Sequence, residues 1–201
     1  MSELTVLQAV RLKGRVSEVD LHATLGEDPA DVTATLTQLT DAGLLISGKT
    51  LRISPDGRER LNTLLAQERS GIDQSALAKT YDDFRSVNAV FKALVSDWQI
   101  KDGEPNLHDD GEYDAAVLAR LDKVHQQVSP IITAAAKQLP RLSAYAEKLN
   151  SALEKVKARD TIWLTRPIID SYHTVWFELH EELLVASGLT REEEAQAGHA
   201  S

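Results

Sequence analysis

Polar side chains that could carry chemistry gather near the C-terminal end of the sequence, in a segment predicted to be helical. Asp170, His173 and His180 follow one another at intervals of three and seven residues, so on a helix they project from one strip beside the apolar face. Asp-x-x-His is a possible pair of metal ligands, with a third ligand from His108 or His125. The strip could instead line a polar pocket for a small effector, or hydrogen-bond to neighbouring helices. Because no spacing here is as specific as His-Glu-x-x-His, we assign no metal ligand.

Asn88 occupies an otherwise apolar position of another predicted helix, where an unsatisfied buried amide would cost about 1–3 kcal/mol. It could pair with its copy across a two-fold axis, or face a cavity toward Asp170 and His173. All three tryptophans lie in the same part of the chain, which favours aromatic surroundings for these groups. We predict an effector pocket from six residues: Asn88, Trp98, Asp170, His173, Trp176 and, at its edge, His180. The alternative is a dry core whose polar groups satisfy one another.

A second set of candidate residues lies near the N-terminus and would bind DNA. The predicted helix at residues 28 to 42 buries one apolar face, and its opposite face would read base edges through Thr33, Ala34, Thr37 and Gln38. Gln38 can pair with adenine, and Thr37 or Ala34 can touch a thymine methyl group. Phosphates would be contacted by basic residues outside this helix: Arg11, Lys13, Arg15, Lys49 and Arg52. The helix itself carries no Lys or Arg, and Asp31 and Asp41 would repel the DNA backbone.

These residues need a scaffold, and the caps and turns of the first 70 residues predict one. Ser17 and Asp28 are suitable N-cap residues for two helices that follow a first helical segment, and Gly26 ends the earlier of the two. Residues 44 to 54 have the pattern of a short β-hairpin, after which another helix begins. Three helices followed by a hairpin predict a winged helix-turn-helix over residues 1 to 70.

Three stretches resemble the winged helix of MarR-like bacterial transcription regulators: residues 21 to 26, 32 to 45 and 53 to 58. The shared features are a small-residue turn, a Leu-x-x-Leu-x-x-Ala-Gly-Leu helix end and a wing that closes on Ser-Pro-x-Gly-Arg. In that family basic wing residues contact phosphate, which implies the same role for Lys49 and Arg52. The resemblance covers the N-terminal part alone, and the recognition helix departs from the family because it lacks a basic residue. The layout is similar to regulators that join a winged helix to a helical effector-binding domain.

The second half of the chain, residues 75 to 190, is predicted to be an all-α helical bundle, so the whole fold is mainly α. Helices are expected near residues 75–100, 112–139, 141–158 and 167–188, with a polar loop at 101–111 and no strands. Pro130 should break or kink the second of them. The heptad seam from Leu77 to Trp98 should pack along its whole length, partly across the interface of a homodimer. The acidic tail from Thr190 would add one short turn.

Composition narrows the class of protein. The chain of 201 residues has no cysteine, which excludes disulfides and thiolate metal sites and agrees with a reducing cytoplasm. No signal peptide or membrane-spanning run is evident, so we expect a cytoplasmic protein that does not enter a membrane. Gly-x-Ser-x-Gly, Walker and dinucleotide-binding patterns are missing, and the carboxylates of Glu181 and Glu182 have no convincing partner. We therefore expect neither an enzyme nor a cofactor.

These features together predict a dimeric transcription regulator that binds double-stranded DNA and whose helical domain senses a small effector. The formal net charge of −9 argues against a simple DNA-binding surface, because DNA-binding proteins usually present a basic footprint. The alternative is therefore a winged-helix protein that no longer binds DNA and serves as a protein-interaction or assembly module.

Overall fold

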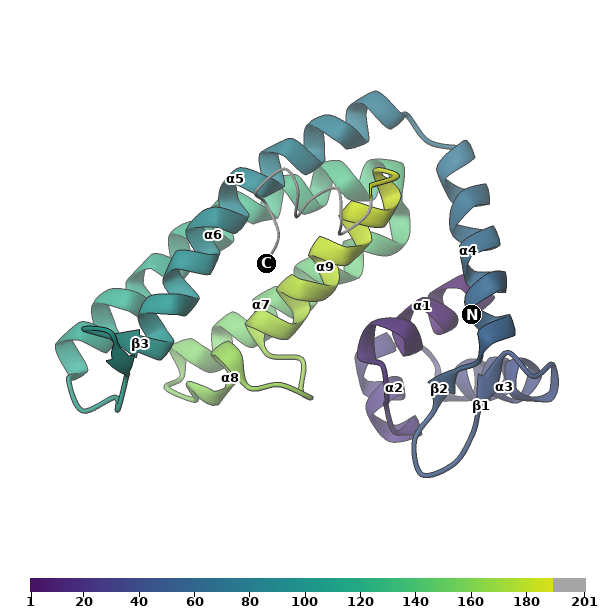
Figure 1. Cartoon of the computed structure of the whole chain (residues 1–201), viewed down its shortest axis with the longest axis horizontal. Coiled ribbons are helices and arrows are strands. Elements are labelled where there is room, and N and C mark those ends of the chain that lie inside the picture. Colours follow the sequence, from purple (N-terminus) through teal and green to yellow (C-terminus); the bar gives the residue numbers. More distant parts are fainter. Residues whose placement is uncertain (190–201) are drawn as a thin grey trace. The chain divides into compact units, whose positions relative to one another are not determined.

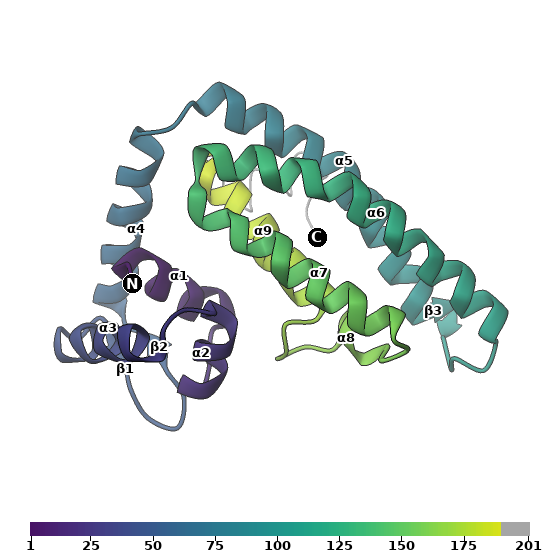
Figure 2. The same ribbon diagram turned by 180° about the vertical axis from the view of Figure 1, so that it is seen from behind.

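A computed structural model describes residues 1–189 and divides the chain into two compact units, Met1–Gly71 and a second unit that begins at Ile72. The protein is mainly helical and has two small antiparallel hairpins within the described part. Figures 1 and 2 show the helices of each unit from opposite sides. The turn expected in the tail from Thr190 lies outside the described residues, as does the last residue of the expected bundle.

The first unit contains four helices and one hairpin. Its elements are α1 (Glu3–Lys13), α2 (Glu18–Leu25), α3 (Pro29–Asp41), β1 (Leu45–Ile46), β2 (Arg52–Ile53) and α4 (Pro55–Ser70). The Ser17 hydroxyl accepts a hydrogen bond from the Asp20 amide at the start of α2, and the Asp28 carboxylate accepts from Ala30 and Asp31 at the start of α3. These bonds satisfy amides that have no partner inside the helix, so both helices begin where the sequence predicts.

The hairpin closes over a core made of aliphatic side chains. Leu45 pairs with Ile53 across β1 and β2, and an isolated bridge joins Val16, between α1 and α2, to Leu51. The core of the unit comprises Val6, Leu7, Val10, Val16, Leu21, Val32, Leu36, Leu39, Leu45, Leu51, Ile53, Leu61 and Leu65. No Phe, Tyr or Trp occurs before Tyr81, so the apolar part of this core consists of branched aliphatic residues.

Up to residue 189, the second unit contains four long helices and several short elements. These are α5 (Gln74–Gln99), β3 (Ile100–Lys101), β4 (Glu104–Pro105), α6 (Gly111–Gln138), a 3-10 turn at Pro140–Ser143, α7 (Ala144–Lys157), α8 (Ile162–Thr165) and α9 (Tyr172–Ala186). Helices α5 and α6 lie side by side and antiparallel (Figures 1 and 2), and the Asp73 amide before α5 donates to the Gln138 side chain at the end of α6. An Arg120–Asp97 ion pair of 2.6 Å joins their other halves.

The heptad seam of α5 packs inside this unit. Its seven positions are Leu77, Tyr81, Phe84, Asn88, Phe91, Val95 and Trp98, and all are buried within one chain. The seam therefore packs along its whole length as expected, but against α6 and α9 of its own chain rather than across a dimer interface. If the expected dimer forms through the second unit, its interface must lie on another surface of that unit.

Three local expectations for the second unit are wrong. The segment at 101–111, expected to be a loop, begins with the β3–β4 hairpin. The sequence signal for this hairpin is Asp102-Gly103, a pair that favours a two-residue turn, and both residues have positive φ angles. Of the break or kink expected at Pro130, the break does not occur: α6 continues through this residue, and the nearby Val128, Ile131 and Ile132 are buried in the core. Helix α9 begins at Tyr172 rather than near Pro167.

Candidate functional site

The outward face of α3 is the first candidate site. Thr33, Ala34, Thr37 and Gln38 are all exposed, while the opposite side of the helix is buried in the unit. The Thr37 hydroxyl donates to the Thr33 carbonyl at 3.0 Å, and the Thr33 hydroxyl lies 3.4 Å from Nε2 of His22 on α2. Gln38 makes no side-chain hydrogen bond within residues 1–189, so its amide is free to bind a ligand. The face is polar and carries no positive charge.

The five residues expected to contact phosphate differ in how exposed their side chains are. Lys49 and Arg52 lie exposed on the hairpin, and Arg15 is exposed just before the bridge at Val16. Arg11 is half-buried, and its Nε donates to the Gln8 side chain at 3.1 Å; Lys13 is half-buried as well. The hairpin and Arg15 thus offer the most accessible positive charges among the five.

The second candidate site is the polar interior of the second unit, where Asn88 contacts Trp176. The indole Nε1 of Trp176 donates to Oδ1 of Asn88 at 2.8 Å, and both side chains are buried. The Phe84 and Phe91 rings flank the indole, with centroids 5.2 and 4.3 Å away. This bond satisfies the amide oxygen that the sequence leaves without a partner.

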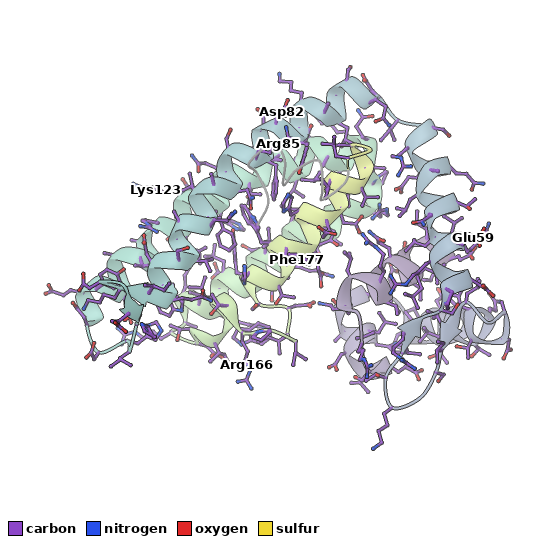
Figure 3. The ribbon with its side chains drawn as sticks, viewed as in Figure 1. Glu59, Asp82, Arg85, Lys123, Arg166 and Phe177 are labelled. Carbon is purple, nitrogen blue, oxygen red and sulfur yellow. The ribbon has the colours of Figure 1, made fainter. Side chains whose placement is uncertain are left out.

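His180 joins the same interior from one turn further along α9. Its Nε2 lies 3.1 Å from the Tyr81 hydroxyl, and its ring is 5.5 Å from Phe84. The guanidinium of Arg85, labelled in Figure 3, covers the Tyr81 ring at 4.6 Å. Three of the six predicted pocket residues, Asn88, Trp176 and His180, therefore lie around the same aromatic cluster. Their mutual bonds favour a packed polar core over the predicted effector pocket.

Of the other three predicted pocket residues, Trp98 and Asp170 lie apart from this cluster, and His173 meets only its edge, through Phe91. Trp98 lies ten residues after Asn88 on α5, about 15 Å along the helix axis, and its ring contacts His108 at 4.3 Å. Asp170 precedes α9, because the helix begins only after Ser171, whose hydroxyl caps it by accepting from the Thr174 amide. His173 is exposed, with one side of its ring near Phe91, and the loss of water on that side lowers its pKa.

A row of buried acids on α9 has a partner that could not be inferred from the sequence. Glu178, Glu181 and Glu182 are buried, and an ion pair of 2.7 Å joins Glu182 to Arg141 before α7. The Tyr145 hydroxyl donates to the other Glu182 oxygen at 3.4 Å. Burial and the nearby glutamate charges raise the pKa of Tyr145 well above its usual value. A glutamate on the core side of the final helix was the available signal.

The histidines considered as metal ligands have separate partners. His125 on α6 lies 3.3 Å from the Tyr172 hydroxyl, and His108 lies 3.0 Å from Asp114. Within residues 1–189, no group of three or more His, Asp or Glu side chains is arranged to hold a metal ion. The described part also contains no helix that is long and apolar enough to cross a membrane.

The His125 environment leads to an expected pH dependence. Burial and the Lys157 charge lower the pKa of His125 below 6.5, so below that pH the unfolded chain binds a proton more readily than the folded one. The stability of the second unit should therefore fall as the pH drops from 7 to about 5, and His125→Gln should reduce this loss. Urea unfolding followed by tryptophan emission measures it, with His22→Gln in the first unit as control. An unchanged pH dependence in His125→Gln would contradict the assignment.

Comparisons with known proteins do not place the chain in a family. No family model, no curated protein and no solved structure matches it.

Proposed function

We propose that the first unit is a winged helix-turn-helix, a class of DNA-binding module. The proposal is supported by the order of its elements, three helices followed by a hairpin, and by the Gly26 turn, whose φ of 65° lets α3 follow directly after α2. The bridge between Val16 and Leu51 adds a third extended segment beside the hairpin. In this arrangement α3 is the recognition helix and the loop between β1 and β2 is the wing.

The particular function that we propose is a transcription regulator that binds double-stranded DNA as a homodimer. The observation that carries it is the exposed surface of Thr33, Thr37 and Gln38 on α3, in the same unit as a wing with exposed Lys49 and Arg52. In such a complex, phosphate contacts from the wing would position the protein and Gln38 would read a base edge. No effector is assigned to the second unit, because its interior polar groups bond to one another.

Selection of double-stranded DNA fragments by the purified full-length protein tests the proposal. A dimer should enrich fragments with an inverted repeat whose half-sites lie about one helical turn apart. Retention of fragments without a shared sequence would indicate binding through phosphates alone. If no fragment is retained even at low salt, DNA binding is wrong.

Replacing both wing cations should weaken binding to every DNA sequence. Lys49→Ala together with Arg52→Ala removes up to two phosphate contacts, so the slope of log affinity against log salt should flatten by about two. A gel-shift titration over a salt series measures the slope. Lys79→Ala with Lys123→Ala, two exposed lysines of the second unit, is the matched control. An unchanged slope would remove the wing from the interface.

One observation favours a second candidate function, a protein-interaction module without DNA binding. Helix α3 carries no Lys or Arg, and Asp31 and Asp41 are exposed on it. Carboxylates on a recognition helix repel phosphate, so this face suits a protein partner better than a nucleic acid. Failure of the fragment selection, with the first unit folded, is the outcome that this candidate predicts.

A further inference from the structure

Exposed apolar side chains gather at one end of the second unit. Among its described residues, six large apolar side chains are exposed: Val90, Ile100, Leu107, Ile162, Ile168 and Phe177. Four of them, Ile100, Leu107, Ile162 and Ile168, belong to the end where α5 and α7 finish and where α6 and α9 begin. Leu107 is 81% and Ile168 88% exposed, so both offer nearly their whole side chains to a partner.

The segment that joins α5 to α6 at this end is acidic, and we call its residues 100–112 the tip. The tip contains five carboxylates and one lysine, a formal net charge of −4. Its shape is fixed by hydrogen bonds, because Lys101 binds Asp110 at 2.9 Å and the Asn106 side chain donates both to the Trp98 carbonyl and to Asp114. Glu104 and Asp109 are exposed on it. The tip is an ordered acidic surface with Leu107 in its middle.

The second half of this end is basic, and we call residues 155–168 the shoulder. It contains four cations and one carboxylate, a formal net charge of +3 within a chain of −9. Arg159 and Arg166 are exposed and form no ion pair within residues 1–189, and Arg166 points away from the bundle (Figure 3). Ile168 has a φ of 79°, which a β-branched residue rarely adopts, and this backbone holds its side chain in water.

The tip extends beyond the shoulder along the bundle axis. Lys157 at the end of α7 binds Asp122 at 2.8 Å, and Tyr172 at the start of α9 contacts His125. Asp122 lies eleven residues into α6, so the tip reaches about 16 Å further than the end of α7. Figure 1 shows this step, with the β3 hairpin beyond α8. Because the tip is acidic and the shoulder is basic, the tip of one copy is complementary in charge to the shoulder of a second copy.

We propose that two copies of this chain associate through this end of the second unit, with the tip of each copy on the shoulder of the other. A two-fold axis makes the two contacts identical, and each pairs Glu104 and Asp109 with Arg159 and Arg166 of the second copy. The apolar side chains of the tip and the shoulder are then buried at the centre of each contact, surrounded by opposite charges. This surface deepens the proposed function by naming the dimer interface, and it does not depend on DNA binding.

Charge reversal tests the interface in the full-length chain without DNA. Arg159→Glu with Arg166→Glu makes the shoulder acidic, and Glu104→Lys with Asp109→Lys makes the tip basic. Sedimentation equilibrium should show a dimer for the wild type and at least tenfold weaker association for each variant, because like charges then meet. An equal mixture of the two variants should dimerise again, since every tip then meets a shoulder of opposite charge. Merely structural effects of the substitutions would not produce this recovery.

A matched control changes charge elsewhere by the same amount. Lys79→Glu with Lys137→Glu alters two exposed lysines at the opposite end of α5 and α6 and should leave the association unchanged. A wild type that stays monomeric at all concentrations, or variants that dimerise as tightly as the wild type, would overturn the interface. Either result can be told apart from failure of the proposed function, because monomers with a working winged helix would still be retained on DNA in the fragment selection.

Discussion

Arg141→Ala is expected to lower the free energy of unfolding of the second unit by about 3–5 kcal/mol. The Arg141 guanidinium lies 2.7 Å from Glu182, and the two side chains are only 14% and 3% exposed. Removing the cation leaves a buried carboxylate whose remaining described donor is the Tyr145 hydroxyl, 3.4 Å from its other oxygen. A buried charge that loses its partner costs far more than the intact pair contributes.

Urea unfolding followed by tryptophan emission measures this effect in the second unit, where all three tryptophans lie. Lys157→Ala is the control, because it removes a comparable ion pair with Asp122 whose two side chains are nearly half exposed. That pair should contribute less than about 1 kcal/mol. Adding Glu182→Gln to Arg141→Ala should recover part of the loss, since no unpaired charge then remains. Equal effects of Arg141→Ala and Lys157→Ala would show that burial does not govern this pair.

Gly57→Ala should destabilise the first unit by roughly 3 kcal/mol, near the upper end for overpacking a core. A Cβ at Gly57 would lie 2.1 Å from the Leu44 carbonyl oxygen and 2.9 Å from a side-chain carbon of Ile53. The helix cannot move aside freely, because the Gly57 amide donates to the Ser54 hydroxyl that caps α4. Either the cap or the contact between α4 and the hairpin must therefore be lost.

Gly71→Ala is the matched control for this substitution. A Cβ there would meet its nearest atom, the Glu68 carbonyl oxygen, at an ordinary 3.6 Å. Thermal unfolding followed by circular dichroism should show an early loss of helix for Gly57→Ala and none for Gly71→Ala, while tryptophan emission stays unchanged in both. A normal melting curve for Gly57→Ala would mean that α4 can separate from the hairpin at little cost.

Much of the first unit can be predicted from sequence because its signals are local. Ser17 and Asp28 cap helices within three residues of themselves, and Gly26 ends α2 by adopting a left-handed conformation. Such signals do not depend on what packs against them. In the second unit, Pro130 carries an equally local signal for a break, yet the burial of its neighbours overrides it. Local signals of this kind therefore predict where a helix begins or ends when the burial of neighbouring residues does not favour another structure.

The polar interior of the second unit could be predicted only in part. The heptad position of Asn88 indicates that it needs a partner, but that partner, Trp176, lies 88 residues away on α9. The pairing of Glu182 with Arg141 depends in the same way on how α9 is rotated against its neighbours. Because α9 begins at Tyr172 and not near residue 167, Asp170 lies before the helix and not on it. The periodicity of apolar residues identifies the buried face of each helix. The hydrogen-bond and ion-pair partners depend on how the helices align with one another, which a single sequence does not show.

Each unit has its own core, so a substitution in either core acts first on the stability of that unit. Among the described residues, the core from Leu77 to Ala186 is made of side chains of the second unit. We therefore expect a calorimetric trace of the whole chain to contain two cooperative transitions, and a fit to one transition to give a van't Hoff enthalpy below the calorimetric one. We therefore expect that a substitution in one core can melt its own unit while the other unit keeps its fold, so that mutational damage accumulates separately in the two units.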